Sequence, residues 1–174
     1  MHKAGFIAIV GKPNAGKSTL LNTLLGQDLS IVTHKAQTTR HRIRGVVSQP
    51  DYQLVFSDTP GIITPGYQLH QRMMTFVQSA FADADVVLLV YDALGNDMDA
   101  EKFKTLLPCD KKLVVALNKI DLSNQEELEN IVQKIEQQLN PDAIVPISAK
   151  EKFGGDVLIK TLLQFIPEAP PYFD

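Results

Sequence analysis

The residues best suited to chemistry in this 174-residue sequence form a loop bounded by two glycines. Residues 11–18, GKPNAGKS, fit the phosphate-loop pattern G-x-x-x-x-G-K-[ST]. The glycines let backbone N–H groups turn toward a phosphate, and a following helix start favours an anion. Lys17 would add positive charge for the β- and γ-phosphates, and Ser18 a hydroxyl oxygen for Mg²⁺. The predicted nucleotide contacts are Gly11, Lys12, Pro13, Asn14, Ala15, Gly16, Lys17, Ser18 and Thr19.

A second group of candidates follows the apolar run 54–56. A carboxylate at the carboxyl end of a strand, beside the phosphate loop, can hold Mg²⁺ directly or through water. Asp58 is in that position, and the Gly61 N–H can contact a γ-phosphate. Thr39, favoured over Thr38, could close over the ion. The predicted magnesium ligands are thus Ser18, Thr39 and Asp58, and the further nucleotide contacts are Thr59, Pro60, Gly61 and Ile62. An ordinary turn and solvated threonines are the alternatives.

Two later loops indicate which base is bound. Asp121 can accept hydrogen bonds from N1–H and the 2-amino group of guanine, and adenine lacks both donors. The Ala149 N–H can donate to guanine O6, Asn118 can tie loops together, and the stem of Lys119 can cover the ring. Polar loops after strands are common, so neither loop is specific alone, but together they predict guanine. The predicted contacts are Asn118, Lys119, Ile120, Asp121, Ser148, Ala149 and Lys150.

Continuous apolar runs alternate along the sequence with amphipathic stretches. The strands and helices that they predict must position these loops. Such runs are typical of strands buried on both faces. The predicted strands are 6–10, 43–48, 52–56, 85–91, 112–117 and 143–147, with a hairpin turn at 49–51. The predicted helices are 17–25, 69–82, 99–107, 126–139 and 156–165. Strands alternating with helices predict an α/β domain with a mostly parallel sheet.

Composition excludes several other classes. Hydrophobic residues make up 44% and charged residues 21%, as in globular domains, and the net charge of −3 excludes a uniformly basic surface. Cys109 is the single cysteine, so an intrachain disulfide is excluded and a reducing compartment is expected. The longest aliphatic run, 86–90, is far too short to span a membrane. Residues 34–44 carry four Lys or Arg residues and no acid; a solvated basic loop is favoured there over an RNA contact.

The motifs GKPNAGKS, TT, DTPG, NKID and SAK resemble the five motifs of translation-factor-class GTPases. The segments KAQTTRHRIRGV, SDTPGI and FIPEAPPYFD resemble the Era family of bacterial GTPases more specifically. This resemblance implies a Ras-like P-loop GTPase domain, with a six-stranded, mostly parallel sheet and helices on both faces. It also implies GTP/GDP and Mg²⁺ binding, GTP hydrolysis, and a role in small ribosomal subunit assembly through 16S rRNA.

The same resemblance implies domain boundaries and a location. Residues 1–167 correspond to the GTP-binding domain, and residues 168–174 to the start of a linker to a C-terminal KH domain that this sequence lacks. Most of the contact with the small ribosomal subunit and 16S rRNA is expected through that KH domain. The expected location is cytoplasmic, with peripheral association with the inner membrane, and this chain is expected to be a monomer.

Hydrolysis is expected to involve Asn14, Lys17, Thr39 and Gly61. Ras-type enzymes orient water with a glutamine at the position of Ile62, so intrinsic hydrolysis should be slow. The resemblance implies that Asn14 and carbonyls of residues 35–39 bind K⁺ in place of an arginine finger; alternatively, Asn14 only braces the loop. A GTP-gated docking module without appreciable hydrolysis remains open. An ATP-dependent phosphotransferase and a free-standing RNA-binding protein are disfavoured, by the guanine loops and by the acidic composition respectively.

Overall fold

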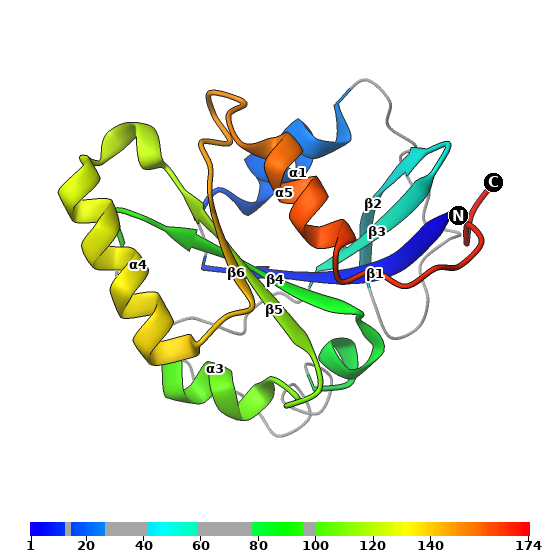
Figure 1. The fold of residues 1–174 in the computed structure, drawn as a ribbon, viewed down its shortest axis with the longest axis horizontal. Coiled ribbons are helices and arrows are strands. Elements are labelled where there is room, and N and C mark those ends of the chain that lie inside the picture. Colours follow the sequence, from blue (N-terminus) through cyan, green and yellow to red (C-terminus); the bar gives the residue numbers. More distant parts are fainter. Residues whose placement is uncertain (13–14, 27–41, 59–77, 96–99) are drawn as a thin grey trace.

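A six-stranded sheet forms the centre of the computed structural model, which describes residues 1–12, 15–26, 42–58, 78–95 and 100–174 (Figure 1). The strands are β1 (Lys3–Gly11), β2 (Arg42–Gln49), β3 (Tyr52–Asp58), β4 (Val86–Asp92), β5 (Lys112–Asn118) and β6 (Ala143–Pro146). The helices are α1 (Lys17–Leu25), α3 (Ala100–Leu106), α4 (Gln125–Leu139) and α5 (Gly155–Leu163), with a 3₁₀ turn at Ile120–Leu122. Residues 78–83 are also helical. Every predicted strand is confirmed, and the ends shift by three residues or fewer.

The strand order is β2-β3-β1-β4-β5-β6, and β2–β3 is the antiparallel pair. The predicted hairpin is confirmed, since Gln49 lies opposite Tyr52 in its register. β1 pairs in parallel with both β3 and β4, so the chain moves to either side of β1 as the sheet grows. Such a switch point opens a crevice at the carboxyl ends of the strands, where ligands bind in open α/β sheets.

Helices cover both faces of this sheet, as predicted. Successive side chains of a strand point to opposite faces, so Ile7 and Ile9 of β1 pack with α1 and α5. Ala8 and Val10 pack on the other face with the 78–83 helix, α3 and α4. Burial on both faces explains why the central strands, such as β1 and β4, are continuously apolar rather than alternating. In the described part of the chain, no helix is both long and apolar enough to cross a bilayer.

Local capping sets where the helices begin. α4 begins one residue earlier than predicted because Asn124 caps it: the Glu127 N–H donates to Asn124 Oδ1 at 2.8 Å. α5 begins at Gly155 after Gly154, which has a φ of 86°. A Cβ on Gly154 would lie 2.7 Å from the Pro146 carbonyl oxygen, so a glycine is required at this close approach.

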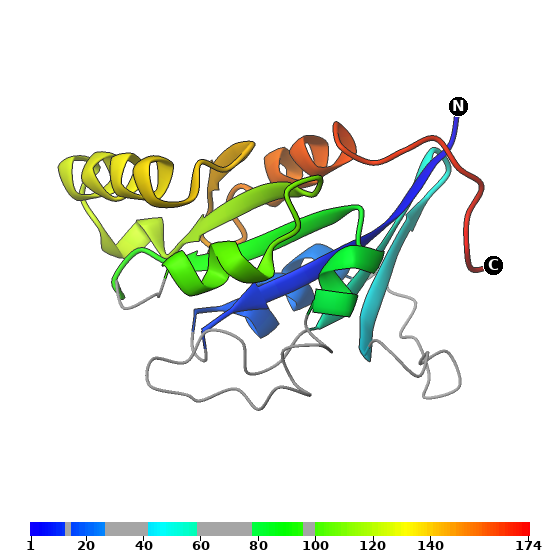
Figure 2. The same ribbon diagram turned by 90° about the horizontal axis from the view of Figure 1, so that it is seen from below.

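The C-terminal tail, predicted to begin a linker, packs along the domain (Figure 2). Its residues are irregular, as the prolines require, but the Ala169 N–H donates to the His2 carbonyl at 3.1 Å. Gln53 of β3, only 2% exposed, accepts from the Tyr172 and Phe173 N–H groups at 2.7 and 3.0 Å. Its amide donates to the Phe173 carbonyl at 2.9 Å. Gln53 therefore fixes the tail against the sheet near the N-terminus.

Aromatic contacts accompany this attachment. The Tyr172 and Phe6 ring centroids are 4.8 Å apart, and Phe173 packs against Val46 and Val55. Partial burial, and then the charge of Asp85, raise the pKa of the Tyr172 phenol.

Replacing Gln53 by leucine is expected to lower the free energy of unfolding by about 2 kcal/mol, because two backbone N–H groups of the tail lose their acceptor. Urea unfolding followed by circular dichroism measures the change. Gln164→Leu is the matched control, since Gln164 is exposed at the end of α5. Equal unfolding midpoints for Gln53→Leu and the unsubstituted chain would show that the bonds of Gln53 to the tail add nothing to stability.

Candidate nucleotide-binding site

The predicted site residues that the structure describes lie at the carboxyl edge of the sheet. Asp58, the last residue of β3, lies opposite Ile9 of β1, and Asp92 of β4 lies opposite Asn118 of β5. The phosphate loop leaves β1 between these two pairs. The backbone register therefore places the phosphate loop between the predicted magnesium strand and the predicted base-binding strand.

The phosphate loop enters α1 through a left-handed glycine. Gly16 has a φ of 99°, and the Leu20 N–H donates to its carbonyl at 2.8 Å in the first turn of the helix. A Cβ at Gly16 would overlap Nδ2 of Asn118, so conformation and space both require glycine. Ser18 and Thr19 are exposed in the first turn, where helix N–H groups have no intrahelical acceptor. This geometry is suited to an anion.

Asn118 joins the three loops of the site. Its side chain is buried, donates from Nδ2 to the Ala15 carbonyl at 2.9 Å, and accepts from the Ala149 N–H at 3.0 Å. The prediction that Asn118 ties loops together is confirmed. The second bond also changes the expectation for Ala149, because guanine O6 would have to share an N–H that already donates to Asn118. Sequence could not reveal this acceptor, which lies 31 positions away.

Asp121 is oriented by a serine of the neighbouring loop. The buried Ser148 hydroxyl donates to Asp121 Oδ1 at 2.8 Å. The 3₁₀ turn that carries Asp121 is attached to the end of β6, since the Ile120 N–H donates to the Ile147 carbonyl at 3.3 Å. Asp121 itself is exposed. A fixed, accessible carboxylate at this edge can accept hydrogen bonds from a base.

Two residues at the site were not predicted. Asp92 Oδ2 lies 2.9 Å from Lys119 Nζ, and Thr23 of α1 donates to the Ala149 carbonyl at 3.0 Å. Asp92 ends an apolar run at the same sheet edge, the signal that identified Asp58, so the sequence did contain a clue. Thr23 is a half-buried polar residue within a helix, and nothing in the sequence distinguishes it.

Part of the predicted site lies outside the described residues, and for Asp58 the structure gives the backbone position alone. The residues outside are Pro13, Asn14, Thr39, Thr59, Pro60, Gly61 and Ile62, with the 35–39 segment. Within the described ranges, no three His, Cys, Asp or Glu side chains cluster as a metal site would require. The predicted donors are a hydroxyl and a carboxylate on neighbouring elements, a set suited to Mg²⁺, which takes its other ligands from phosphate and water.

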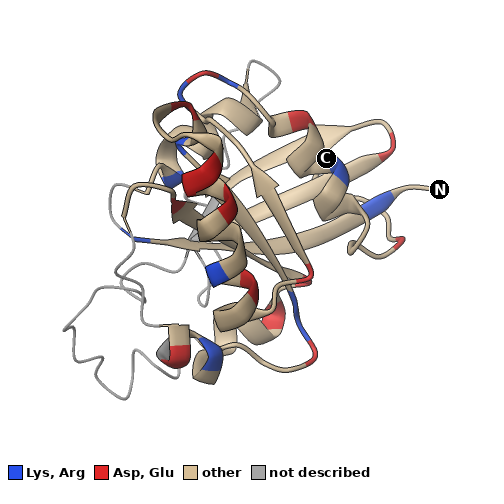
Figure 3. Cartoon of the chain, turned by 60° about the vertical axis from the view of Figure 1, so that its left-hand side comes forward, with Lys and Arg blue, Asp and Glu red and all other residues tan. Residues whose placement is uncertain are grey.

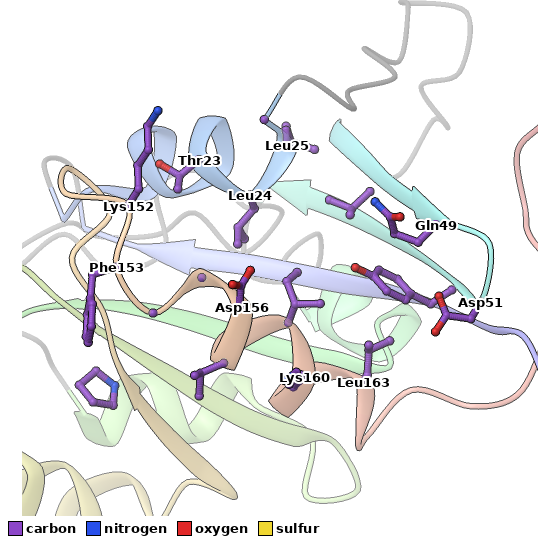
Figure 4. Close-up of a pocket in the computed structure, with 18 residues that line it drawn as sticks. Thr23, Leu24, Leu25, Gln49, Asp51, Lys152, Phe153, Asp156, Lys160 and Leu163 are labelled. Carbon is purple, nitrogen blue, oxygen red and sulfur yellow. The ribbon is translucent and has the colours of Figure 1, made fainter.

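The surface contains a separate groove of about 1040 Å³ between α1, α5 and the β2–β3 hairpin (Figure 4). Leu24, Tyr52 and Leu163 line it, together with Asp51 and Asp156, and none of the predicted nucleotide contacts does. Burial, and then the charges of these two aspartates, raise the pKa of the Tyr52 phenol. The groove adjoins the loop cluster at Thr23, which lines the groove and donates to the Ala149 carbonyl.

Charge on the described surface argues against an RNA contact at α4. This helix carries four glutamates and one lysine, and acidic positions gather along it in Figure 3. Such a surface repels a phosphate backbone. Most of the basic 34–44 segment lies outside the described residues.

Known proteins are similar to this chain in sequence and in fold. Residues 6–119 match the family described as 50S ribosome-binding GTPase. The GTPase Era of Bordetella avium is 44% identical over 99% of this chain, and that of Alkaliphilus metalliredigens is 39% identical. The chain spans 59% of the length of each of these relatives.

Solved Era structures agree with the fold. An Era variant of Aquifex aeolicus bound to GDP·AlF₄⁻ is 37% identical with a TM-score of 0.78, and the match covers 99% of this chain and 60% of that one. An Era complex with MgGDPNP and nucleotides 1506–1542 of 16S ribosomal RNA is 38% identical with a TM-score of 0.78, over 100% and 60% of the two chains. From the fold, the convergence of the loops and these matches, we conclude that the chain belongs to the family of 50S ribosome-binding GTPases and is similar to Era proteins along nearly its whole length.

Proposed function

We propose that this chain binds guanine nucleotides with Mg²⁺ and hydrolyses GTP to GDP and phosphate as a molecular switch. The observation that carries this proposal is the Asn118 side chain, which bonds to Ala15 and Ala149 and so holds the phosphate loop against the base-binding loops. One buried side-chain amide thereby fixes the spacing between the phosphate loop and the loops that are proposed to bind the base. The nucleotides named in the Era structures support the same ligand class.

Guanine is selected by Asp121 and the loop that follows β6. The Asp121 carboxylate accepts from N1–H and the 2-amino group, and Ser148 keeps it in place. The Ala149 N–H, shared with Asn118, donates to O6. The Lys119 stem covers one face of the ring. Adenine offers no donors to Asp121 and an amino group where O6 would be, so adenine nucleotides leave these groups unpaired.

The phosphates lie on the loop 11–18 and the first turn of α1. Backbone N–H groups and Lys17 hold the β- and γ-phosphates, and the Gly61 N–H contacts the γ-phosphate alone. Ser18, Thr39 and Asp58 would hold Mg²⁺, which neutralises phosphate charge when bound. Loss of the γ-phosphate releases the contacts of Thr39 and Gly61, which provides the switch.

Potassium is proposed to raise the rate through Asn14. The residue is similar to an asparagine that helps to bind K⁺ in related GTPases, where the ion offsets charge as an arginine finger would. We expect GTP turnover to be faster in KCl than in NaCl by about tenfold, and Asn14→Ala to remove that difference. Asn22→Ala is the control, because Asn22 is exposed on α1 outside the loop. A salt preference that survives in Asn14→Ala would rule out this role.

The cellular role proposed is small ribosomal subunit assembly, supported by the 16S rRNA fragment in the Era complex. Residues 1–167 would form the GTP-binding domain, and residues 168–174 would lead toward a KH domain such as Era proteins carry. Most of the RNA contact would belong to that domain. We further propose a monomeric, cytoplasmic protein with peripheral inner-membrane association.

Turnover of GTP by the pure chain with Mg²⁺ tests the enzymatic proposal, with ATP as the control substrate. We expect slow release of phosphate from GTP, because Ile62 cannot orient water. We expect no release from ATP, because adenine leaves Asp121 unpaired. Binding of GTP without release of phosphate in KCl or NaCl would favour the GTP-gated docking module. Competition of ATP with GTP for the site would favour the phosphotransferase.

A further inference from the structure

We propose that Asp92 is a positioning residue for the base site: it holds the Lys119 ammonium group so that the lysine stem is already in place to cover guanine. The inference rests on the proposed guanine-nucleotide function. It adds a residue from β4 to a site whose other base contacts follow β5 and β6.

The geometry around Asp92 is specific. Asp92 is the last residue of β4 and lies opposite Asn118, the residue before Lys119. Its Oδ2 accepts from Lys119 Nζ at 2.9 Å, and its Oδ1 accepts from the Leu94 N–H at 2.8 Å. The side chains of Lys119 and Asp92 are only 30% and 19% exposed. Both carboxylate oxygens are engaged, so the carboxylate cannot swing away without losing a bond.

The backbone of Lys119 is fixed independently of Asp92. Lys119 has a φ of 67°, in the left-handed region, between the buried Asn118 and the anchored Ile120 N–H. The backbone path of Lys119 is therefore set, and Asp92 acts on its long side chain. A lysine side chain that has to be ordered when a ligand binds weakens binding, because it loses its conformational freedom at that step. The bond to Asp92 removes that ordering step, because the side chain is ordered beforehand.

Asp142 provides a matched control. It also accepts from a backbone N–H, that of Leu113 at 2.8 Å, and pairs with a lysine, Lys112, at 3.7 Å. Lys112 begins β5, so this pair lies at the opposite edge of the sheet from the nucleotide loops. Asp142→Asn thus makes the same chemical change without any route to the base.

The test compares GDP and inorganic tripolyphosphate binding to the whole chain by calorimetry and competition. Asp92→Asn keeps an acceptor for Leu94 but removes the charge that attracts Lys119. We expect its Kd for GDP to rise about fivefold to tenfold, while its Kd for tripolyphosphate, which has no base, stays unchanged. Asp142→Asn should change neither constant. Equal losses of GDP and tripolyphosphate binding would reduce Asp92 to a structural role and overturn the proposal.

A second variant changes the other member of the pair, Lys119. Lys119→Gln is expected to weaken GDP binding, and adding Asp92→Asn to it should cause no further loss, because Asp92 acts through Lys119. Fully additive losses would contradict the proposal. GDP binding by Asp92→Asn equal to that of the unsubstituted chain would overturn this inference alone. An unsubstituted chain that failed to bind GDP would overturn the proposed function as well.

Discussion

Replacing Asp121 by asparagine is expected to weaken GDP binding by about a hundredfold or more and to strengthen binding of xanthosine diphosphate. The carboxylate offers two acceptors to two guanine donors, and Ser148 fixes it by donating to Oδ1 at 2.8 Å. In the variant, Ser148 holds the amide oxygen and leaves the NH₂ group toward the base. That group opposes the guanine 2-amino group, but it can donate to the oxygen that xanthine has in its place.

Competition against a fluorescent guanine nucleotide measures both affinities. Asp110→Asn is the control, because Asp110 is exposed in the turn before β5, away from the carboxyl edge. Equal GDP affinities for Asp121→Asn and the unsubstituted chain would remove Asp121 from the base site. A loss of GDP binding without any gain for xanthosine diphosphate would indicate that the loop had been distorted.

Gly16→Ala is expected to abolish measurable nucleotide binding and to lower the free energy of unfolding by about 3 kcal/mol. A side chain at a φ of 99° is strained, and its Cβ would overlap Asn118 Nδ2. In the unsubstituted chain, Asn118 Nδ2 lies 2.9 Å from the Ala15 carbonyl oxygen. In the variant the Asn118 side chain must move away, so a buried amide loses its partner and the loops separate. The alanine methyl group would thus break the contact that carries the proposed function.

Gly26→Ala separates backbone strain from this clash. Gly26 also has a positive φ, 46°, but the nearest atom to its added Cβ is 3.8 Å away. It should lose some stability and keep its affinity for GDP. Thermal unfolding and GDP titration of the two variants provide the comparison. Nucleotide binding by Gly16→Ala at the level of Gly26→Ala would show that the Asn118 contact does not organise the site.

The sheet was predictable because its strands are buried on both faces and are therefore continuous in apolar character. The strands β5 and β6 are predicted from such runs, and their ends locate Asn118 and Ser148 without knowledge of strand order. Asp58 was placed at the edge by the same reasoning, and the register of β1 and β3 confirms its backbone position. The hydrophobic periodicity and the composition of the sequence are enough to predict such buried strands, because burial dictates both.

Contacts between distant residues could not be predicted. Gln53 and Tyr172 are 119 positions apart, and their bond depends on how the tail crosses the edge of the sheet. The pairing of Asp92 with Lys119 likewise depends on the register of β4 and β5. Prolines 167, 170 and 171 correctly predicted a tail without a helix, but they do not reveal that it packs. These contacts decide the finer geometry of the site and of the C-terminal tail.

Calorimetric titration of the whole chain with GDP and, separately, with ADP, both with Mg²⁺, is the most direct test of the account. The account predicts saturable binding of GDP and binding of ADP weaker by about a hundredfold, because adenine leaves Asp121 and its neighbours unpaired. Equal affinities for the two nucleotides, or no heat of binding with either, would contradict it.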